Sequence, residues 1–370
     1  MNKALLTASM IIRNEEYFLA DCLDSIKDIV DEIVIVDTGS TDHGKKIAKC
    51  FDARVFDFPW CDDFAAARNE SLRHSRGKWI LYIDADERVR NTDRKVLEKC
   101  LADHEKVAFT VRFRPYVGFT TYREYRLFRN DPRIQFNGYI HETIVPSLNA
   151  VSAEDSTTIG HCDLTIEHEG YEGNQDHKHR RNLPLLREQL KEDPKRVYCW
   201  WHLGWVLKGL GDEGGAEDAW LSAIEVIREK GNRDMSDSLP YADLARLRLN
   251  NGKDVKALIE EALQLFPNQY LLMWIKGQIK TSDGKLEDAI SVFKHLISVD
   301  AQEVEDEKLA YDEKIFTVFS YEPLANCYFK LGRYEEAACY YELCSTSDPN
   351  NLEHKIKFQL ANARMKSKMP

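Results

Sequence analysis

The feature that most constrains this fold is a change in hydrophobic period near residue 170. Before it, short apolar segments alternate with segments of helical period. The expected strands are LLTASMII (5–12), EIVIVD (32–37), RVFDF (54–58) and KWILYID (78–84), and the expected helices are EEYFLADCLDSIKDI (15–29), HGKKIAKCF (43–51) and FAAARNESLRHS (64–75). Apolar, β-branched strands that alternate with helices predict a mostly parallel sheet with helices on both faces. After Asp86, VAFTVRFRPYV (107–117) and YREYRLFRN (122–130) predict a mixed or antiparallel section.

From about residue 178 the chain is helical and repetitive. One copy carries Trp200, Leu203, Gly204, Leu207, Ala216, Trp220 and Ala223 at the spacing of the tetratricopeptide repeat, and another carries Tyr321, Leu324, Ala325, Tyr328, Ala337, Tyr341 and Pro349. Weaker copies between them carry Ala262 with Pro267, and Gly277 with Ala289 and Phe293. We predict an α/β domain over residues 1–175 and a helical array of about four repeats over residues 176–370. The concave face of such an array commonly binds peptides or proteins.

Charge and composition exclude several classes of protein. The net charge of -11 argues against a general nucleic-acid-binding role, which needs a basic surface, although it leaves room for a local basic site. No apolar run approaches the length of a membrane span, and we interpret the N-terminal residues as a first strand and not as a signal peptide. The nine cysteines contain no CxxC pair, so we expect reduced thiols in a cytoplasmic protein.

The segment VDEIVIVDTGSTD (30–42) ends an expected strand with Asp37-Thr-Gly-Ser, which is also the signature of the aspartic proteases. Those enzymes need two such loops, because two carboxylates must share one proton. This chain has one loop, and it lies within a strand–helix alternation. The protease interpretation is therefore disfavoured, and the Gly-Ser-Thr after Asp37 is expected to turn the chain into the next helix, with Ser40 or Thr41 as its cap.

Two carboxylates, Asp84 and Asp86, follow the expected strand in WILYIDADER. Ligands of open parallel sheets bind at the carboxyl ends of the strands, and carboxylates there can hold a hard divalent ion against a diphosphate. A solvated acidic turn is the alternative. An EF-hand loop is excluded, since the required glycine and final glutamate are absent from the segment that begins at Asp84.

Together with SMIIRNEE, VDTGSTD and FAAARNESLRHSRGKWILYIDADER, these motifs resemble the family 2 glycosyltransferases. The resemblance covers roughly residues 5–170 and implies the α/β fold called GT-A, the nucleotide-diphospho-sugar transferase fold, here followed by an all-α tetratricopeptide-repeat array. A bacterial subgroup has the same fusion and includes transferases that glycosylate ribosomally made peptides or flagellin.

The resemblance implies a role for each motif residue. Asp37 would accept a hydrogen bond from the uracil-type base of a UDP-sugar, and Arg13 and Glu15 would line the nucleotide pocket. Arg68 would lie near the pyrophosphate or the acidic motif. Asp84 would contact the ribose or the metal, and Asp86 would bind Mn²⁺ or Mg²⁺. For Arg13 and Glu15, a capping or surface pair is the alternative.

Two later residues complete the predicted site. Glu142, in FNGYIHETIVP, is the candidate base that takes the proton from the acceptor, with a surface salt bridge as the alternative and Asp163 as a weaker candidate. His168 would be a further metal ligand, or else a histidine packed at the domain edge. For the basic stretch DHKHRRN (176–182) we expect a solvated face or phosphate contacts, and not metal binding.

These residues predict a metal-dependent inverting glycosyltransferase that moves a hexose or N-acetylhexosamine from a UDP-sugar to a polypeptide. The acceptor would be a Ser, Thr or Cys of a bacteriocin-like peptide or flagellin, presented by the repeats. We expect no nucleic-acid partner and no membrane span, and the repeats leave room for a homodimer. The alternatives are a transferase that acts on a cell-surface glycan and a non-catalytic repeat scaffold.

Overall fold

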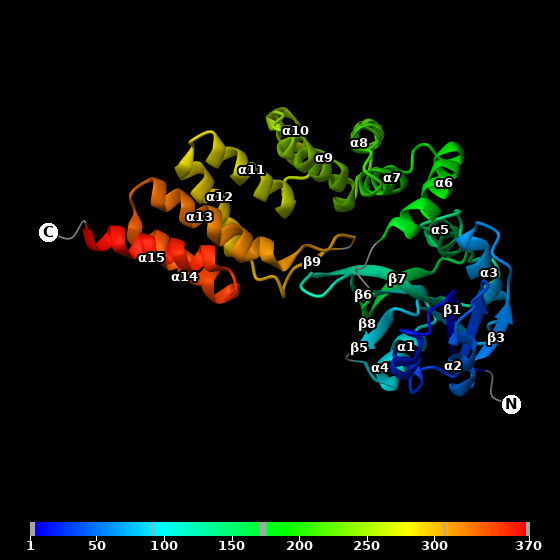
Figure 1. Ribbon diagram of the computed structural model, residues 1–370. Helices are drawn as coiled ribbons and strands as arrows, with labels where there is room; N and C mark the ends of the chain where they lie inside the picture. Colours follow the sequence, from blue (N-terminus) through cyan, green and yellow to red (C-terminus); the bar gives the residue numbers. More distant parts are fainter. Residues whose placement is uncertain (1–3, 91, 171–174, 307, 368–370) are drawn as a thin grey trace. The chain divides into compact units, whose positions relative to one another are not determined.

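The computed structural model describes residues 4–90, 92–170, 175–306 and 308–367 (Figure 1). The chain divides into two compact units. The first comprises residues 1–117 and 121–219, and the second comprises residues 118–120 and 220–370. The first unit thus contains helices that follow residue 175, where we predicted the domain boundary, and that boundary stays a prediction.

The first unit is built on a mixed sheet. Its strands are β1 (Leu6–Ile12), β2 (Glu32–Asp37), β3 (Arg54–Asp57), β4 (Trp79–Tyr82), β5 (Glu87–Arg90), β6 (Lys106–Arg114), β7 (Thr121–Arg129) and β8 (Thr158–His168), in the order β3-β2-β1-β4-β7-β6-β8-β5. The first four strands in that order are parallel, whereas β7 is antiparallel to both β4 and β6. The predicted parallel sheet with a mixed second section is therefore confirmed.

Helices cover both faces of this sheet (Figure 1). Their bounds are α1 (Leu19–Ile26), α2 (Gly44–Cys50), α3 (Phe64–His74), α4 (Arg94–Leu101) and α5 (Val145–Glu154). The first unit also contains α6 (Asp176–Glu192) and α7 (Val197–Gly209). Alternate side chains of β1, from Leu6 to Ile12, pack in one core with α1, α2 and α4. The side chains between them face α3, where the hydroxyls of Ser9 and Ser71 lie 2.6 Å apart. Residues of α3 and α5 form the core of that second face.

The second unit is helical. Its elements are most of α8 (Glu213–Glu229), then α9 (Leu239–Asn250), α10 (Lys256–Leu265), α11 (Tyr270–Ser282), α12 (Leu286–Ile297), α13 (Val318–Lys330), α14 (Tyr334–Ser347) and α15 (Leu352–Ser367), with two short 3-10 helices (Met235–Ser238, Glu313–Phe316) and strand β9 (Glu305–Asp306). Gly277 of α11 lies against Phe293 of α12, and a Cβ on Gly277 would lie 2.6 Å from the phenyl ring. Small residues therefore occur where paired helices approach closely, as the repeat pattern predicted. Within the described residues, no helix is long and apolar enough to cross a bilayer.

Candidate functional site

The carboxyl ends of β1, β2 and β4 meet at one edge of the sheet, because the three strands are parallel. Ile12 pairs with Asp37 in register, so the loops after β1 and β2 are neighbours. Asn14 joins them: its backbone N–H donates to the Ser40 hydroxyl at 2.9 Å, and its side-chain oxygen accepts from the Thr41 N–H at 2.8 Å. The expectation that Ser40 or Thr41 caps α2 is therefore wrong, since both bind the neighbouring loop instead.

Asp37 is held by its own turn. Its Oδ1 accepts the backbone N–H groups of Gly39 and Ser40, both at 2.9 Å. The turn needs glycine at position 39, where φ is +109°. Burial opposes ionisation of Asp37, but the hydrogen bonds and the nearby charge of Lys45 outweigh it, so its pKa lies below the ordinary value. Its Oδ2 is buried and has no hydrogen-bond partner within the described chain, so this oxygen can accept an N–H from a ligand.

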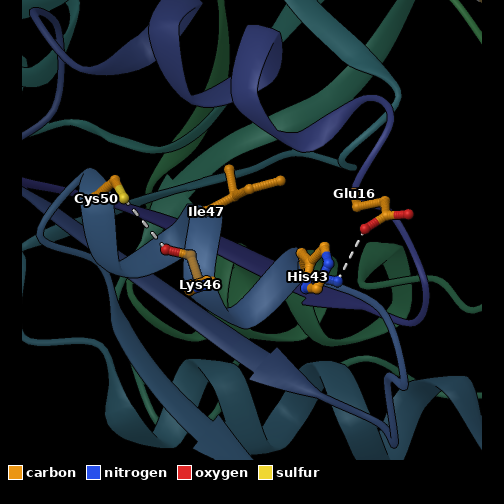
Figure 2. A pocket seen from close by; sticks show the side chains of 5 residues that line it. All are labelled: Glu16, His43, Lys46, Ile47 and Cys50. Atoms are coloured by element: carbon orange, nitrogen blue, oxygen red, sulfur yellow. Dashed lines mark hydrogen bonds between the residues drawn. The ribbon is translucent and has the colours of Figure 1, made fainter.

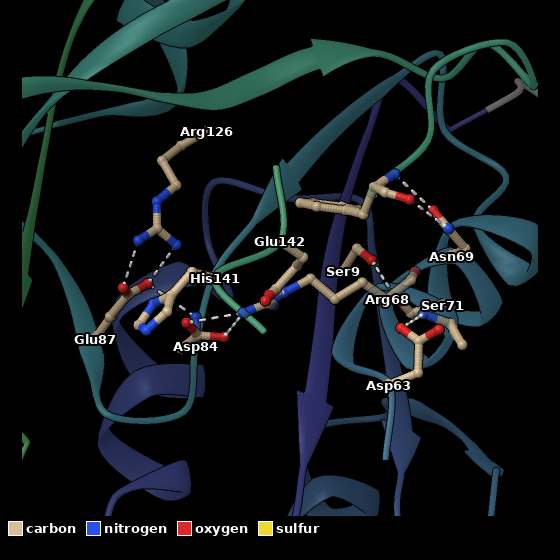
Figure 3. Close-up of polar contacts among 12 residues, drawn as sticks. Ser9, Asp63, Arg68, Asn69, Ser71, Asp84, Glu87, Arg126, His141 and Glu142 are labelled. Atoms are coloured by element: carbon tan, nitrogen blue, oxygen red, sulfur yellow. Dashed lines mark hydrogen bonds and ion pairs between the residues drawn. The ribbon is translucent and has the colours of Figure 1, made fainter. Parts of the chain in front are cut away.

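Arg68 joins two of the predicted residues (Figure 3). Helix α3 begins at Phe64 and is capped by the preceding Asp63, whose side chain accepts the Ala66 N–H at 2.9 Å. One turn later the guanidinium of Arg68, which is 8% exposed, donates Nη2 to both oxygens of Asp84, at 2.9 and 3.1 Å. Its Nε donates to Oε1 of Glu142. The structure therefore brings Arg68, Asp84 and Glu142 into one ion-paired cluster, in which Arg68 and Glu142 are largely buried and the side chain of Asp84 is 32% exposed.

Two residues that we did not predict, Glu87 and Arg126, stabilise the acidic turn after β4. Glu87 accepts the backbone N–H of Asp84 at 2.9 Å and forms a bidentate ion pair with Arg126 of β7, at 2.8 and 3.1 Å (Figure 3). The Arg126 guanidinium also stacks on the ring of Tyr82, 4.1 Å from its centre. Glu87 and Arg126 thus fix the direction in which the Asp84 turn leaves the strand.

Asp86 and His168 face each other across the ends of β4 and β8. Nε2 of His168 lies 3.1 Å from Oδ2 of Asp86, and its Nδ1 lies 3.1 Å from the carbonyl oxygen of Pro115. Burial opposes protonation of His168, but the hydrogen bond and charge of Asp86 outweigh it and raise its pKa; the same contact lowers the pKa of Asp86. Gly170 closes over this pair, since a Cβ there would lie 2.5 Å from the imidazole ring and 3.0 Å from Oδ2 of Asp86.

This geometry fits a divalent cation. If Nδ1 donates its proton to Pro115, a neutral imidazole presents its Nε2 lone pair to the carboxylate of Asp86, and two acceptors at that distance need a proton or a cation between them. Among the described residues no group of three or more His, Cys, Asp or Glu side chains could hold a metal. A cation at Asp86 and His168 would therefore take its other ligands from water and from substrate phosphates, as Mg²⁺ commonly does.

Charged residues of the loop after β1 and of α6 interact electrostatically with the Asp86–His168 pair and with one another. Burial, and then the negative charge of Asp86, raise the pKa of Glu15 to about 7, while Lys178 of α6 partly offsets this effect. Arg181 of α6 stacks on Phe64 at 5.3 Å, and burial followed by the charge of Arg13 lowers its pKa. These effects indicate that Arg13 and Glu15 lie on the side of the site that faces Asp86 and α6, and their role in the nucleotide pocket stays a prediction.

Glu142 lies in a tightly held loop. The preceding residue, His141, has a positive φ of +52°, and its carbonyl oxygen accepts from Arg196. Its ring stacks on His202 of α7 at 3.8 Å, and burial followed by the charge of Arg196 lowers its pKa to about 3. Asp163, the weaker candidate for the base, lies elsewhere on β8, 77% exposed and paired with Arg112 at 3.0 Å.

A cavity of about 380 Å³ lies beside α2 (Figure 2). It is lined by Glu16, His43, Lys46, Ile47 and Cys50, and Glu16 accepts the backbone N–H of His43 at 2.9 Å. None of the predicted site residues lines it. We therefore place the candidate site at the sheet edge between Asp37 and His168 and not in this cavity.

The parallel strands of this mixed sheet end at one edge, which carries the buried Asp37, an arginine-bound acidic turn and an Asp–His pair. Such an edge is typical of nucleotide-binding α/β domains. Comparison with known proteins gives the family. Residues 7–157 match glycosyl transferase family 2, and residues 320–351 match a tetratricopeptide repeat. The chain thus contains a family 2 glycosyltransferase domain followed by tetratricopeptide-repeat structure, which confirms the resemblance stated from the sequence.

Two curated relatives share more than this domain. A TPR repeat-containing protein of Synechococcus elongatus is 35% identical over 226 residues, which cover 59% of this chain and 56% of that protein. The SPbeta prophage-derived glycosyltransferase SunS of Bacillus subtilis is 27% identical over 305 residues, which cover 77% of this chain and 71% of SunS. Among solved structures, S. aureus TarS 1-349 in complex with UDP-GlcNAc is similar at 14% identity and a TM-score of 0.38, over 68% of this chain and 88% of that one.

Proposed function

We propose that this chain is a divalent-metal-dependent, inverting glycosyltransferase that moves a hexose or N-acetylhexosamine from a UDP-sugar to a polypeptide. The observation that carries the proposal is the Asp86–His168 pair beside the Arg68–Asp84 ion pair, at the carboxyl edge of a family 2 glycosyltransferase domain. The chain spans 56% and 71% of the two curated relatives above, so the activity proposed here is inferred from the residues of this chain.

Each group at the edge has one task in this reaction. Oδ2 of Asp37 accepts an N–H of the base, and Asp84, held by Arg68, faces the ribose. Asp86 and His168 would hold Mn²⁺ or Mg²⁺, and the bound cation would supply positive charge against the departing diphosphate. Lys178 and Arg181 of α6 add positive charge on the same side of the site.

Glu142 completes the proposed chemistry. The acceptor hydroxyl or thiol attacks the anomeric carbon, the bond from that carbon to the phosphate oxygen breaks, and UDP leaves. Glu142 takes the acceptor proton, because Arg68 holds its carboxylate in place at the edge that carries the acidic turn. The polypeptide acceptor is inferred from the repeats, since such arrays commonly bind peptides. Free cysteines throughout the described chain fit the expected cytoplasmic location.

The test is release of UDP from UDP-glucose and UDP-N-acetylglucosamine, with and without Mn²⁺, together with the mass of Ser-, Thr- and Cys-containing peptides incubated with the enzyme. We expect Mn²⁺-dependent UDP release that is lost in Asp86→Ala and kept in the matched control Asp163→Ala. A peptide that gains the mass of one sugar identifies the acceptor class. Metal-independent release, or equal loss in both variants, would contradict the proposal.

A further inference from the structure

The edge of the sheet opposite to the candidate site carries a second cluster of charged residues. Strands β4, β6 and β8 begin there, and β7 ends there, as the registers of Trp79 with Arg129 and of Lys106 with Thr158 show. Because β6 has nine residues, this edge lies on the order of 30 Å from the candidate site along the strand.

A cavity of about 270 Å³ lies at this opposite edge. Its lining contains Lys78, His104, Lys106, Val107, Arg129, Asn130, Asp131, Val151, Asp155 and Thr157. Three of these side chains carry permanent positive charge, and they come from three neighbouring segments of the sheet. In a chain with a net charge of -11, such a concentration of cations needs an explanation.

The cations of this cavity have no carboxylate partners within the described residues. The ammonium of Lys106 donates to the hydroxyl of Thr158 at 2.8 Å. The guanidinium of Arg129 donates to the backbone carbonyls of Lys106 and Asp103, at 3.1 and 2.9 Å, and stacks 4.1 Å above the ring of Trp79. Burial lowers the pKa of Arg129 and outweighs the opposing charge of Asp103. Lys78 forms no ion pair with any described residue.

The two carboxylates in the lining share a fourth cation, Arg133, which also lies 3.2 Å from Glu154. Arg133 donates Nη2 to Asp131 at 2.7 Å and to Asp155 at 2.5 Å, and it binds a second oxygen of each at 3.0 Å. Counted together, Lys78, Lys106, Arg129 and Arg133 outnumber these three carboxylates, so the positive charge of this edge is only partly balanced. The lining also includes Thr157, whose hydroxyl oxygen is buried and has no hydrogen-bond partner in the described part of the chain.

Like charges gathered in a partly enclosed space repel one another, and a multiply charged anion removes that repulsion. Ammonium and guanidinium groups form their strongest hydrogen bonds with carboxylate and phosphate oxygens. We propose that this cavity, lined by Lys78, Lys106 and Arg129, binds a small, multiply charged oxyanion, a phosphate or pyrophosphate group, at a site separate from the nucleotide-sugar site. This proposal does not depend on the proposed transferase activity.

The experiment is calorimetric titration of pyrophosphate into the full chain at near-physiological salt, without divalent metal. We expect one saturable site whose affinity falls at least about tenfold in Lys78→Met and in Lys106→Met, since each variant removes a charge-assisted hydrogen bond. The matched control is Lys99→Met, an exposed lysine of α4 on the other face of the sheet, which should bind as the unmodified chain does. Thermal melting of each variant checks that it is folded.

Two further titrations locate the site and its ligand. Asp86→Ala, and the chain saturated with UDP and Mn²⁺, should still bind pyrophosphate. Loss of binding in either case would place the anion at the nucleotide-sugar site and overturn the proposal, as would the absence of saturable binding or an equal effect of Lys99→Met. Vesicles of anionic phospholipid show whether the phosphate group belongs to a lipid or to a soluble molecule. If the protein binds the vesicles and pyrophosphate displaces it, the ligand is a lipid headgroup. If the protein binds pyrophosphate but not the vesicles, the ligand is a soluble phosphate.

Discussion

Replacing Arg68 by methionine tests whether the ion-paired cluster holds the candidate site together. The substitution keeps an apolar stem in a buried position but removes the charge that faces Asp84 and Glu142. Glu142, whose side chain is 10% exposed, would keep a buried charge without a partner. Breaking a buried ion pair on one side destabilises proteins by about 3–5 kcal/mol, and the lost stacking of the guanidinium on Tyr82 at 4.7 Å adds to this.

The assay is urea unfolding of four chains: the unmodified protein, Arg68→Met, Glu142→Gln and the double variant. In the unmodified background, Glu142→Gln should lower the free energy of unfolding, because it removes the partner of a buried guanidinium. In the Arg68→Met background, Glu142→Gln should instead raise the free energy of unfolding by at least about 1 kcal/mol, because it removes a buried carboxylate charge that has no partner.

This reversal of sign is specific to a paired cluster. The control is Arg73→Met on the same helix, where an exposed arginine pairs with Glu70 one turn away and should contribute little. If Glu142→Gln destabilises both backgrounds equally, or if Arg68→Met unfolds at the same urea concentration as Arg73→Met, the two side chains do not form the ion pair described here.

Three further predictions concern single residues. Burial raises the pKa of Glu15 to about 7, so its ionisation opposes folding as the pH rises from its ordinary pKa through about 7; Glu15→Gln should therefore raise the free energy of unfolding near pH 8 and change it little near pH 5. An equal effect at both pH values in urea unfolding would refute this. Gly170→Ala places a methyl group against His168 and should weaken Mn²⁺-dependent UDP binding in calorimetry, with the melting temperature nearly unchanged; unchanged binding would contradict the close approach. Gly277→Ala forces the ring of Phe293 to move and should destabilise the helical unit by about 1–3 kcal/mol in urea unfolding, whereas Gly284→Ser, at an exposed turn, would show only the strain of a positive φ. Unfolding unaffected by Gly277→Ala would refute the packing argument.

The strands that were predicted best are those whose sequence is mostly apolar and whose residues are nearly all buried. EIVIVD matches β2 at both ends, and LLTASMII exceeds β1 by one residue. Strands of a parallel sheet are buried on both faces, so their sequences are nearly continuous in apolar and small residues. Strand β5 was missed, since its sequence ERVR is polar although its first three residues are buried. That burial follows from pairing with β8, which is distant in sequence.

The sequence predicts the position of a site residue only where that residue lies within a short local motif. The placement of Asp37, Asp84 and Asp86 at one edge follows from strand direction alone, and the structure confirms that the three strands are parallel. The pairing of Arg68 with Glu142 joins residues far apart in sequence, and no local pattern encodes it. The role of Glu87 was concealed because it follows directly on the acidic motif and looks like one more surface carboxylate.

The central claim is that Asp86 and His168 hold a divalent cation against the diphosphate of a uridine nucleotide. The most direct measurement is calorimetric titration of UDP, with and without Mn²⁺, into the unmodified chain, Asp86→Ala, His168→Ala and the control Asp163→Ala. We predict micromolar binding that requires Mn²⁺, that is lost in the first two variants and that persists in the control. Equal binding without Mn²⁺, or UDP binding that survives in both Asp86→Ala and His168→Ala, would contradict it.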